Sequence, residues 1–424
     1  MSRHDDKGDS RAFASLTVPT YRDWFISQIL SASGTMTQIV ALSWLVLQLT
    51  HSGVDLGLVS TAAIAPLLLA GPWAGALVDR VDRRRLLIVT QSLYILLSVL
   101  LAIVTTTGTI RVWMVFVSAF SSGIVGAPDT AARQVYVNDL VGPGRLASAV
   151  SLNEVVINAS RVVGPALGGL LLATAGVGAC IWANAASFVP SLVVLLRHRH
   201  AATASPSGAH AEVHAEVHAA ASAPHDRRFL IGWRYAWGHP TIRLALLLAA
   251  ASGMLFNMNV SLPLVASRVF HLGGGGFGLM MSAFGVGGIL GGLVAAGRGA
   301  PTRRSMVALA LVSGTAVLLT ASARDVGEFY AGLVVTGATS IWFIARANTL
   351  VQHETEAPLR GRVLAVWSMA LPGMMPLTSP LVGFVGSSVG PREGFALAGA
   401  AMVVIAGAGS LRVRNRRERQ VSLA

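Results

Sequence analysis

Long apolar runs, about twelve in number, dominate the sequence, and each is close to the length that a helix needs to cross a bilayer. They lie at roughly 23–48, 56–78, 86–106, 112–133, 148–174, 177–196, 243–265, 275–297, 305–323, 327–349, 362–386 and 393–411. Only 12% of the residues are charged, whereas soluble domains carry about 25%. The sequence therefore predicts an all-α polytopic membrane protein with twelve transmembrane helices.

Basic residues lie in every second gap between these runs. If the N-terminus is cytoplasmic, about 25 of the 32 Lys and Arg residues face the cytoplasm, as the positive-inside rule requires. We therefore expect both termini in the cytoplasm and a multi-pass protein of the cytoplasmic (inner) membrane. Because the net charge of +13 is concentrated in short loops and tails, it indicates topology and attraction to lipid headgroups, not a nucleic-acid partner.

One long polar gap, residues 197–228, divides the runs into two groups of six. The expected organisation is a cytoplasmic tail (1–20), a six-helix bundle (21–196), a His/Ala-rich cytoplasmic linker (197–228), a second six-helix bundle that begins with an interfacial helix (229–411), and a basic tail (412–424). His210, His214 and His218 repeat every four residues in the linker, which on a helix would suit Zn or Ni. A low-complexity linker without metal is the simpler interpretation, and we favour it.

The sequence contains no signature of an enzyme or of a bound cofactor. A GxSxG elbow, an HExxH motif and a Walker lysine loop are all missing. Cys180 is the only cysteine, so neither an intrachain disulfide nor a thiolate metal cluster can form. We therefore expect no catalysis, no cofactor and no ATP-driven pumping by this chain.

Short patterns recur between the two halves at a separation of about 215 to 221 residues. The pairs are Ser33-Gly34 with Ser252-Gly253, Gly57-Leu58 with Gly278-Leu279, Gly144-Arg145 with Gly361-Arg362, and Gly164-Pro165 with Ser379-Pro380. Their order is the same in both halves. The echoes predict two pseudo-symmetric six-helix bundles, with a substrate site between them near the bilayer midplane.

Ionisable residues inside apolar runs are expensive and therefore informative. Glu154, Asn158, Arg161 and Pro165 follow helical spacing, so they form one stripe on the fifth run. The functional interpretation is a cavity-facing stripe in which Arg161 organises a charge network and Glu154 exchanges a proton. The alternative is a structural pair that locks this helix to a neighbour.

Two further sets of polar residues are candidates. Asp129 and Arg133, four residues apart in the fourth run, form either a proton or gate site or a simple i, i+4 ion pair. Residues that could line a substrate cavity are Gln38, Asn158, Asn184, Asn257, Trp367 and Met374. For most of these side chains, hydrogen bonding or packing between helices is the competing interpretation.

The loop between the second and third runs contains Gly75-x-Leu77-x-Asp79-Arg80-x-x-Arg83-Arg84. With Gly164-Pro165-x-x-Gly168-Gly169 in the fifth run, it resembles the major facilitator superfamily, in the exporter branch that includes the enterobactin exporter and macrolide efflux proteins. The resemblance implies that Asp79 braces the cytoplasmic helix ends in the outward-facing state, and that Arg80, Arg83 and Arg84 pair with acids and lipid. Asp82 stands where the family normally has glycine.

The sequence and the resemblance together predict a secondary transporter that works by alternating access. We expect a proton-coupled exporter, monomeric and surrounded by lipid, whose substrates are hydrophobic or amphipathic small molecules such as drugs or siderophore-like compounds. A non-coupled facilitator or lipid flippase on the same fold is the first alternative. A membrane sensor that reads metal or pH through the histidine-rich linker is the second.

Overall fold

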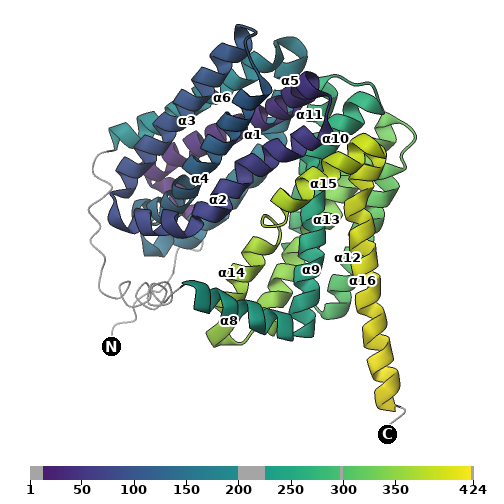
Figure 1. Cartoon of the computed structure of the whole chain (residues 1–424). Coiled ribbons are helices and arrows are strands. Elements are labelled where there is room, and N and C mark those ends of the chain that lie inside the picture. Colours follow the sequence, from purple (N-terminus) through teal and green to yellow (C-terminus); the bar gives the residue numbers. More distant parts are fainter. Residues whose placement is uncertain (1–12, 199–224, 297–298, 422–424) are drawn as a thin grey trace, which may run out of the picture. The chain divides into compact units, whose positions relative to one another are not determined.

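The computed structural model describes residues 13–198, 225–296 and 299–421, and every regular element in these ranges is a helix (Figure 1). The predicted fold class is confirmed, because twelve spans in this part are long and apolar enough to cross a membrane. The helices are α1 (Pro19–Thr50), α2 (Gly53–Arg80), α3 (Arg83–Thr106), α4 (Val112–Val141), α5 (Leu146–Thr174), α6 (Gly176–Arg197), α8 (His225–Gly238), α9 (Pro240–Leu255), α10 (Met258–Arg268), α11 (Gly274–Ala296), α12 (Arg303–Ala321), α13 (Val326–Glu354), α14 (Arg360–Ala370), α15 (Met375–Ser388) and α16 (Pro391–Val421). Short 3₁₀ turns lie at Ala14–Thr17, Pro143–Arg145 and Ala357–Leu359.

The chain forms two compact units, and each contains the opening residues of one helix from the other half of the sequence. Of the described residues, unit 1 comprises 13–50, 62–198 and 274–282, so the first turns of α11 belong to it. Unit 2 comprises 51–61, 225–273, 283–296 and 299–421, so the first turns of α2 belong to that unit. These two exchanged segments matter for the glycine contacts described below.

Each unit has its own packed core. In unit 1, Trp24, Leu87, Tyr136, Leu152 and Leu195 bring α1, α3, α4, α5 and α6 together. The core of unit 2 joins α9, α12, α13, α14 and α16, and contains Ile242, Met306, Phe343, Val366 and Met402. In lipid, where apolar surface gains little from burial, such close packing and hydrogen bonds between helices hold a bundle together.

The seventh and eleventh spans are each interrupted, whereas the sequence indicated a single continuous run for each. The seventh consists of α9 and α10, which meet at Phe256 and Asn257. The eleventh consists of α14 and α15 with a turn at 371–374 between them. Pro372 and Pro376 account for the second interruption, because proline has no N–H to continue the helical hydrogen bonds.

The stretch predicted as an interfacial helix, Phe229–Trp237, lies within helix α8, which is longer. It packs against α14 and α9 (Figure 1). The contact with α14 is close, because a Cβ at Gly232 would lie 2.7 Å from the Arg362 carbonyl oxygen. Trp233 and Trp237 stack on each other with ring centroids 5.0 Å apart and remain partly exposed. Exposed tryptophans suit a helix at the membrane–water boundary.

Candidate functional site

Helix α5 has one face packed into unit 1 and one face that carries charge. The packed face includes Leu152, Val156 and Ser160. Glu154, between the first two of these positions, and Arg161, just after the third, are exposed. The amphipathic pattern thus places two ionisable side chains, about 10 Å apart along the helix axis, on the uncovered side of a membrane-spanning helix.

In the described part of the chain no hydrogen bond or close ion pair involves the Arg161 or Glu154 side chain, although the two opposite charges interact electrostatically with each other. Asn158, one turn away, donates from Nδ2 to the backbone carbonyl of Glu154 at 2.8 Å. A midspan arginine without a hydrogen-bonded counter-ion is costly in hydrocarbon, so such residues face water-filled cavities. Pro165 differs from the rest of the predicted stripe, because it is buried.

Asp129 and Arg133 on α4 form the ion pair that their spacing indicated, and the pair is largely enclosed. The Asp129 side chain is 7% exposed and that of Arg133 is 22% exposed. Arg133 Nε donates to Asp129 Oδ2. The other carboxylate oxygen, Oδ1, accepts from Thr90 Oγ1 at 2.7 Å and from Gln91 Nε2 at 2.9 Å. Both oxygens therefore have partners, and the sequence analysis identified neither Thr90 nor Gln91.

An aromatic side chain also faces the Arg133 guanidinium. The guanidinium carbon Cζ of Arg133 lies over the face of the Trp24 ring, 5.8 Å from the ring centroid. Trp24 packs edge-on against Tyr136 at 5.1 Å. The cation is thus held between a carboxylate and an aromatic ring, so this pair links α4 to α1 and α3.

The loop that resembles the family motif ties three helices of unit 1 together. Asp82 caps α3, with its side chain accepting from the backbone N–H of Arg85 at 2.8 Å. Its φ of −55° shows that the turn does not need glycine. Asp82 therefore has a role of its own in place of the family's glycine: it satisfies a free N–H at the start of α3.

The arginines of this loop bind two different partners. Arg83 pairs with Asp139 near the end of α4, with 3.1 and 3.0 Å from its Nη1 to the two carboxylate oxygens. Arg84 donates from Nε to the Leu195 carbonyl at 2.6 Å and from Nη2 to the Leu196 carbonyl at 3.3 Å. The second contact places a cation at the C-terminus of α6, where the helix dipole favours it. Asp139 was not predicted, because no motif contains it.

The remaining motif residues form an open face. Leu77, Asp79 and Arg80 are exposed. Nothing lies within 4 Å of a Cβ built on Gly75. Among the described residues, the side chains of Asp79 and Arg80 make no ion pair or hydrogen bond.

The glycines of the fifth-span motif allow α5 to approach two other helices. Gly164 and Gly168 contact α1, where Thr37 Oγ1 donates to the Gly164 carbonyl at 2.9 Å. On another side, a Cβ at Gly169 would lie 2.9 Å from the Gly275 carbonyl oxygen in the first turn of α11. Ser282 of α11 donates to the Val162 carbonyl at 3.2 Å. All of these contacts are within unit 1.

Unit 2 contains the counterpart of this arrangement, at the positions that echo in the sequence. A Cβ at Gly57 would lie 2.5 Å from the Ser379 carbonyl oxygen of α15. Thr61, one turn after Gly57, donates to the Pro376 carbonyl at 2.9 Å. That carbonyl is the one left without a helical donor by Pro380. The repeated sequence patterns therefore correspond to a repeated contact: a glycine against a proline-containing helix, with a hydroxyl bonded to its backbone.

Two of the cavity candidates, Gln38 and Asn184, bind each other inside unit 1. Asn184 Nδ2 donates to Gln38 Oε1 at 2.7 Å and to Ser98 Oγ at 3.1 Å. Ser98 in turn donates to Gln38 Oε1 at 3.2 Å. This network joins α1, α3 and α6, so the geometry favours the interhelical interpretation for both residues.

Asn257 lies at the break in the seventh span and binds the helix that follows the break in the eleventh. Its Nδ2 donates to Thr378 Oγ1 at 2.8 Å, and its Oδ1 accepts from Ser379 Oγ at 2.6 Å. Met374 caps the same helix, with its carbonyl accepting from Thr378 Oγ1 at 2.9 Å. Thr378 thus connects Asn257, at one helix break, to the backbone carbonyl of Met374, at the other. Trp367 instead packs against the core of unit 2.

The weak metal candidates His210, His214 and His218 lie outside the described residues. Within the described ranges no group of three or more His, Cys, Asp or Glu residues could hold a metal ion.

A comparison with known protein families identifies the family of this chain. The model of the transmembrane secretion effector family, a branch of the major facilitator superfamily, matches residues 10–422. The chain belongs to this family. It is therefore a transporter and not an enzyme, and the predicted resemblance is confirmed.

Several curated relatives match over nearly their whole length. The chain is 26% identical to the staphyloferrin A transporter of Staphylococcus aureus, over 90% of this chain and 93% of the relative. It is 27% identical to the multidrug efflux pump Tap of Mycolicibacterium fortuitum, over 86% and 88%. Identity to the enterobactin exporter EntS of Citrobacter koseri is 22%, over 92% and 90%.

Solved structures show the same fold. A bacterial homologue of the human lysosomal transporter Spinster superposes with a TM-score of 0.70 at 13% identity, covering 93% of this chain and 96% of that one. At this level of identity the likeness supports the fold alone.

Proposed function

We propose that the protein is a proton-driven exporter of hydrophobic or amphipathic small molecules, drug-like or siderophore-like, in the cytoplasmic (inner) membrane. Both termini face the cytoplasm, and the chain works as a monomer. The observation that best supports this proposal is the face of α5 on which Glu154 and Arg161 are exposed within an apolar span. Charged side chains at that depth need a polar cavity, and a transporter provides one.

The chemistry of this face suits coupled transport. Arg161 supplies a fixed positive charge that attracts acidic groups of a substrate. When the cavity is exposed to the more acidic side of the membrane, Glu154 binds a proton, and the release of that proton on the other side is linked to a change of substrate affinity. In this scheme the substrate and the proton compete for the Glu154 carboxylate, so that protonation releases the substrate.

The relatives support the substrate class by what their names state: one transports staphyloferrin A, one exports enterobactin and one expels multiple drugs. Siderophores and drugs are both small organic molecules. The proposal therefore extends to this chain the property that the named substrates share, not any single compound.

The decisive test is transport into inverted membrane vesicles, with a compound first selected by a growth-inhibition panel with and without overexpression. We expect Arg161→Ala and Glu154→Gln each to reduce proton-gradient-driven accumulation at least tenfold while the protein remains in the membrane. Arg145→Ala serves as the control, because Arg145 is exposed at the start of α5 but lies outside the span. Normal gradient-driven transport in both variants would show that the α5 face is not the site.

A non-coupled facilitator is the second candidate, because both oxygens of Asp129 are already occupied by hydrogen-bond donors. Such a protein would equilibrate the compound in proteoliposomes without a pH gradient and would not concentrate it when a gradient is applied. The proposed exporter concentrates the compound severalfold under the same gradient. Measuring the final concentration ratio with and without a protonophore distinguishes the two.

A further inference from the structure

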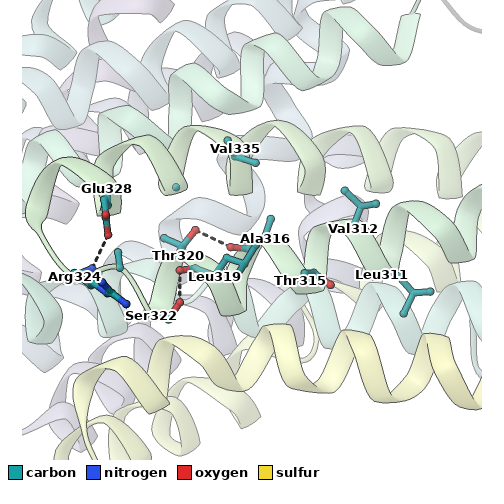
Figure 2. Close-up of a pocket in the computed structure, with 12 residues that line it drawn as sticks. Leu311, Val312, Thr315, Ala316, Leu319, Thr320, Ser322, Arg324, Glu328 and Val335 are labelled. Atoms are coloured by element: carbon teal, nitrogen blue, oxygen red, sulfur yellow. Dashed lines mark hydrogen bonds between the residues drawn. The ribbon is translucent and has the colours of Figure 1, made fainter.

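A groove in unit 2 runs between α12 and α13 from their connecting loop into the membrane span. Its volume is about 700 Å³, within the range of about 300–1,000 Å³ that is usual for small-molecule sites. Figure 2 shows Arg324 and Glu328 at one end and Leu311 and Val312 at the other. Leu311, Val312, Thr315, Ala316 and Leu319 line it from one side of α12.

The groove exists because small residues lie where the two helices meet. Gly332 of α13 sits against Thr320, with a Cβ there falling 2.6 Å from its hydroxyl oxygen. Thr320 also bonds to the Thr336 hydroxyl at 3.0 Å. The helices are therefore fastened along the floor of the groove, while its rim carries exposed apolar side chains such as Leu319, which is 67% exposed.

The dimensions of the groove match one leaflet of a bilayer. From Leu311 to Ser322, α12 and its cap advance by about 17 Å, and half of the hydrocarbon core is about 15 Å thick. The candidate span of α12 ends at Ala321, so the apolar part lies within the membrane and Arg324 lies at its boundary. A lipid acyl chain fits the apolar part, and a headgroup falls beside the loop.

The charges at the mouth of the groove select among headgroups. The Arg324 guanidinium makes no hydrogen bond or ion pair with another described residue. Glu328 is held in place because one carboxylate oxygen, Oε2, accepts from the Arg324 backbone N–H at 2.8 Å. Asp325 caps α13, accepting from the Glu328 N–H at 2.9 Å. Arg324 and Glu328 are the charged residues among those that line the groove, and their opposite charges match those of a zwitterionic headgroup better than those of an anionic one.

We propose that this groove is a binding site for a zwitterionic phospholipid with a primary amine, of the phosphatidylethanolamine type. Arg324 binds the phosphate, and Glu328 binds the ammonium group. An acyl chain lies along Leu311, Thr315 and Leu319. The site is separate from the α5 face, and the inference does not depend on the proposed direction or coupling of transport.

Native mass spectrometry of the purified full chain tests the site. With equal concentrations of phosphatidylethanolamine, phosphatidylglycerol and phosphatidylcholine, we expect at least fivefold more protein bound to phosphatidylethanolamine than to either of the others. Glu328→Gln should abolish this preference over phosphatidylcholine, and Arg324→Ala should weaken binding of all three. Arg111→Ala is the matched control, an exposed arginine in another loop, and should bind as the unaltered protein does.

A second pair of variants locates the acyl chain. Thr315 is exposed in the groove, so Thr315→Trp fills it without disturbing the core and should reduce phosphatidylethanolamine binding at least fivefold. Val404→Trp, at a position on α16 that is 68% exposed, should leave binding unchanged. Equal or stronger binding of phosphatidylglycerol, or unchanged binding by Thr315→Trp, would overturn the proposal.

Discussion

The enclosed pair of Asp129 and Arg133 permits a test that separates a structural role from a proton-carrying one. Asp129→Asn keeps the size of the side chain and an oxygen that can accept from Thr90 and Gln91, but leaves Arg133 without a counter-ion. Arg133→Gln leaves the buried carboxylate with only its two neutral donors. The double variant removes both charges together.

The structure sets the expected magnitudes. Removing one partner of a buried ion pair costs about 3–5 kcal/mol of folding free energy. Here the cost should lie near the lower end, about 3 kcal/mol for each single variant, because the Arg133 side chain is 22% exposed and also faces the Trp24 ring. The double variant leaves no unpaired charge and should also lose about 3 kcal/mol, so the coupling energy is about 3 kcal/mol.

Equilibrium unfolding in mixed micelles measures the four free energies, and transport in inverted vesicles provides an independent readout. If the pair is structural, the double variant is about as stable as each single variant and still transports in response to the pH gradient. If Asp129 carries the proton, the double variant is as stable as the single ones but does not respond to the pH gradient. Free energies that add within about 0.5 kcal/mol would refute the reasoning, because they would show that the two charges do not interact.

Three other substitutions test contacts in unit 1. Asp82→Ala removes the cap of α3 and should cost about 1 kcal/mol, seen as a lower unfolding midpoint, whereas Asp82→Asn should keep most of the stability; equal loss in both would contradict a capping role. Gly164→Val places a side chain against the carbonyl of Ser33, where a Cβ would lie only 2.7 Å away, and should sharply lower the yield of folded protein, while Gly407→Val, which meets no neighbour within 4 Å, should not. Asn184→Ala breaks two interhelical hydrogen bonds of about 0.6 kcal/mol each. It should lower stability modestly without changing which compounds are exported. A changed substrate profile in the growth panel would show that Asn184 lines the substrate cavity.

The membrane fold was predictable because apolar length alone specifies a transmembrane helix. The breaks in the seventh and eleventh spans were not predicted, since hydropathy does not distinguish one long helix from two short ones. Pro372 and Pro376 were a local signal for the second break. The first break depends on Asn257 bonding to Thr378 and Ser379, a contact between residues more than a hundred positions apart.

The candidate site was predictable only in part, because spacing along one helix does not reveal what packs against each face. The exposed positions of Glu154 and Arg161 agree with the predicted stripe. Pro165 is buried against neighbouring helices, which the helical spacing of these residues does not reveal. Gln38 and Asn184 are polar amide side chains within apolar spans, which is equally typical of residues that line a substrate cavity. Only the position of Ser98 on a third helix reveals that they form a closed network.

The hydroxyls of Thr61 and Ser282 bond to backbone carbonyls and not to side chains. A carbonyl is present whichever amino acid occupies the position, so these contacts restrict Thr61 and Ser282 but not the side chains of Pro376 and Val162, whose carbonyls accept the bonds. Mutations can therefore accumulate on α5, the helix that carries Glu154 and Arg161, without loss of these contacts. Substitutions on α5 can therefore change the range of exported compounds while the contacts between the helices are kept.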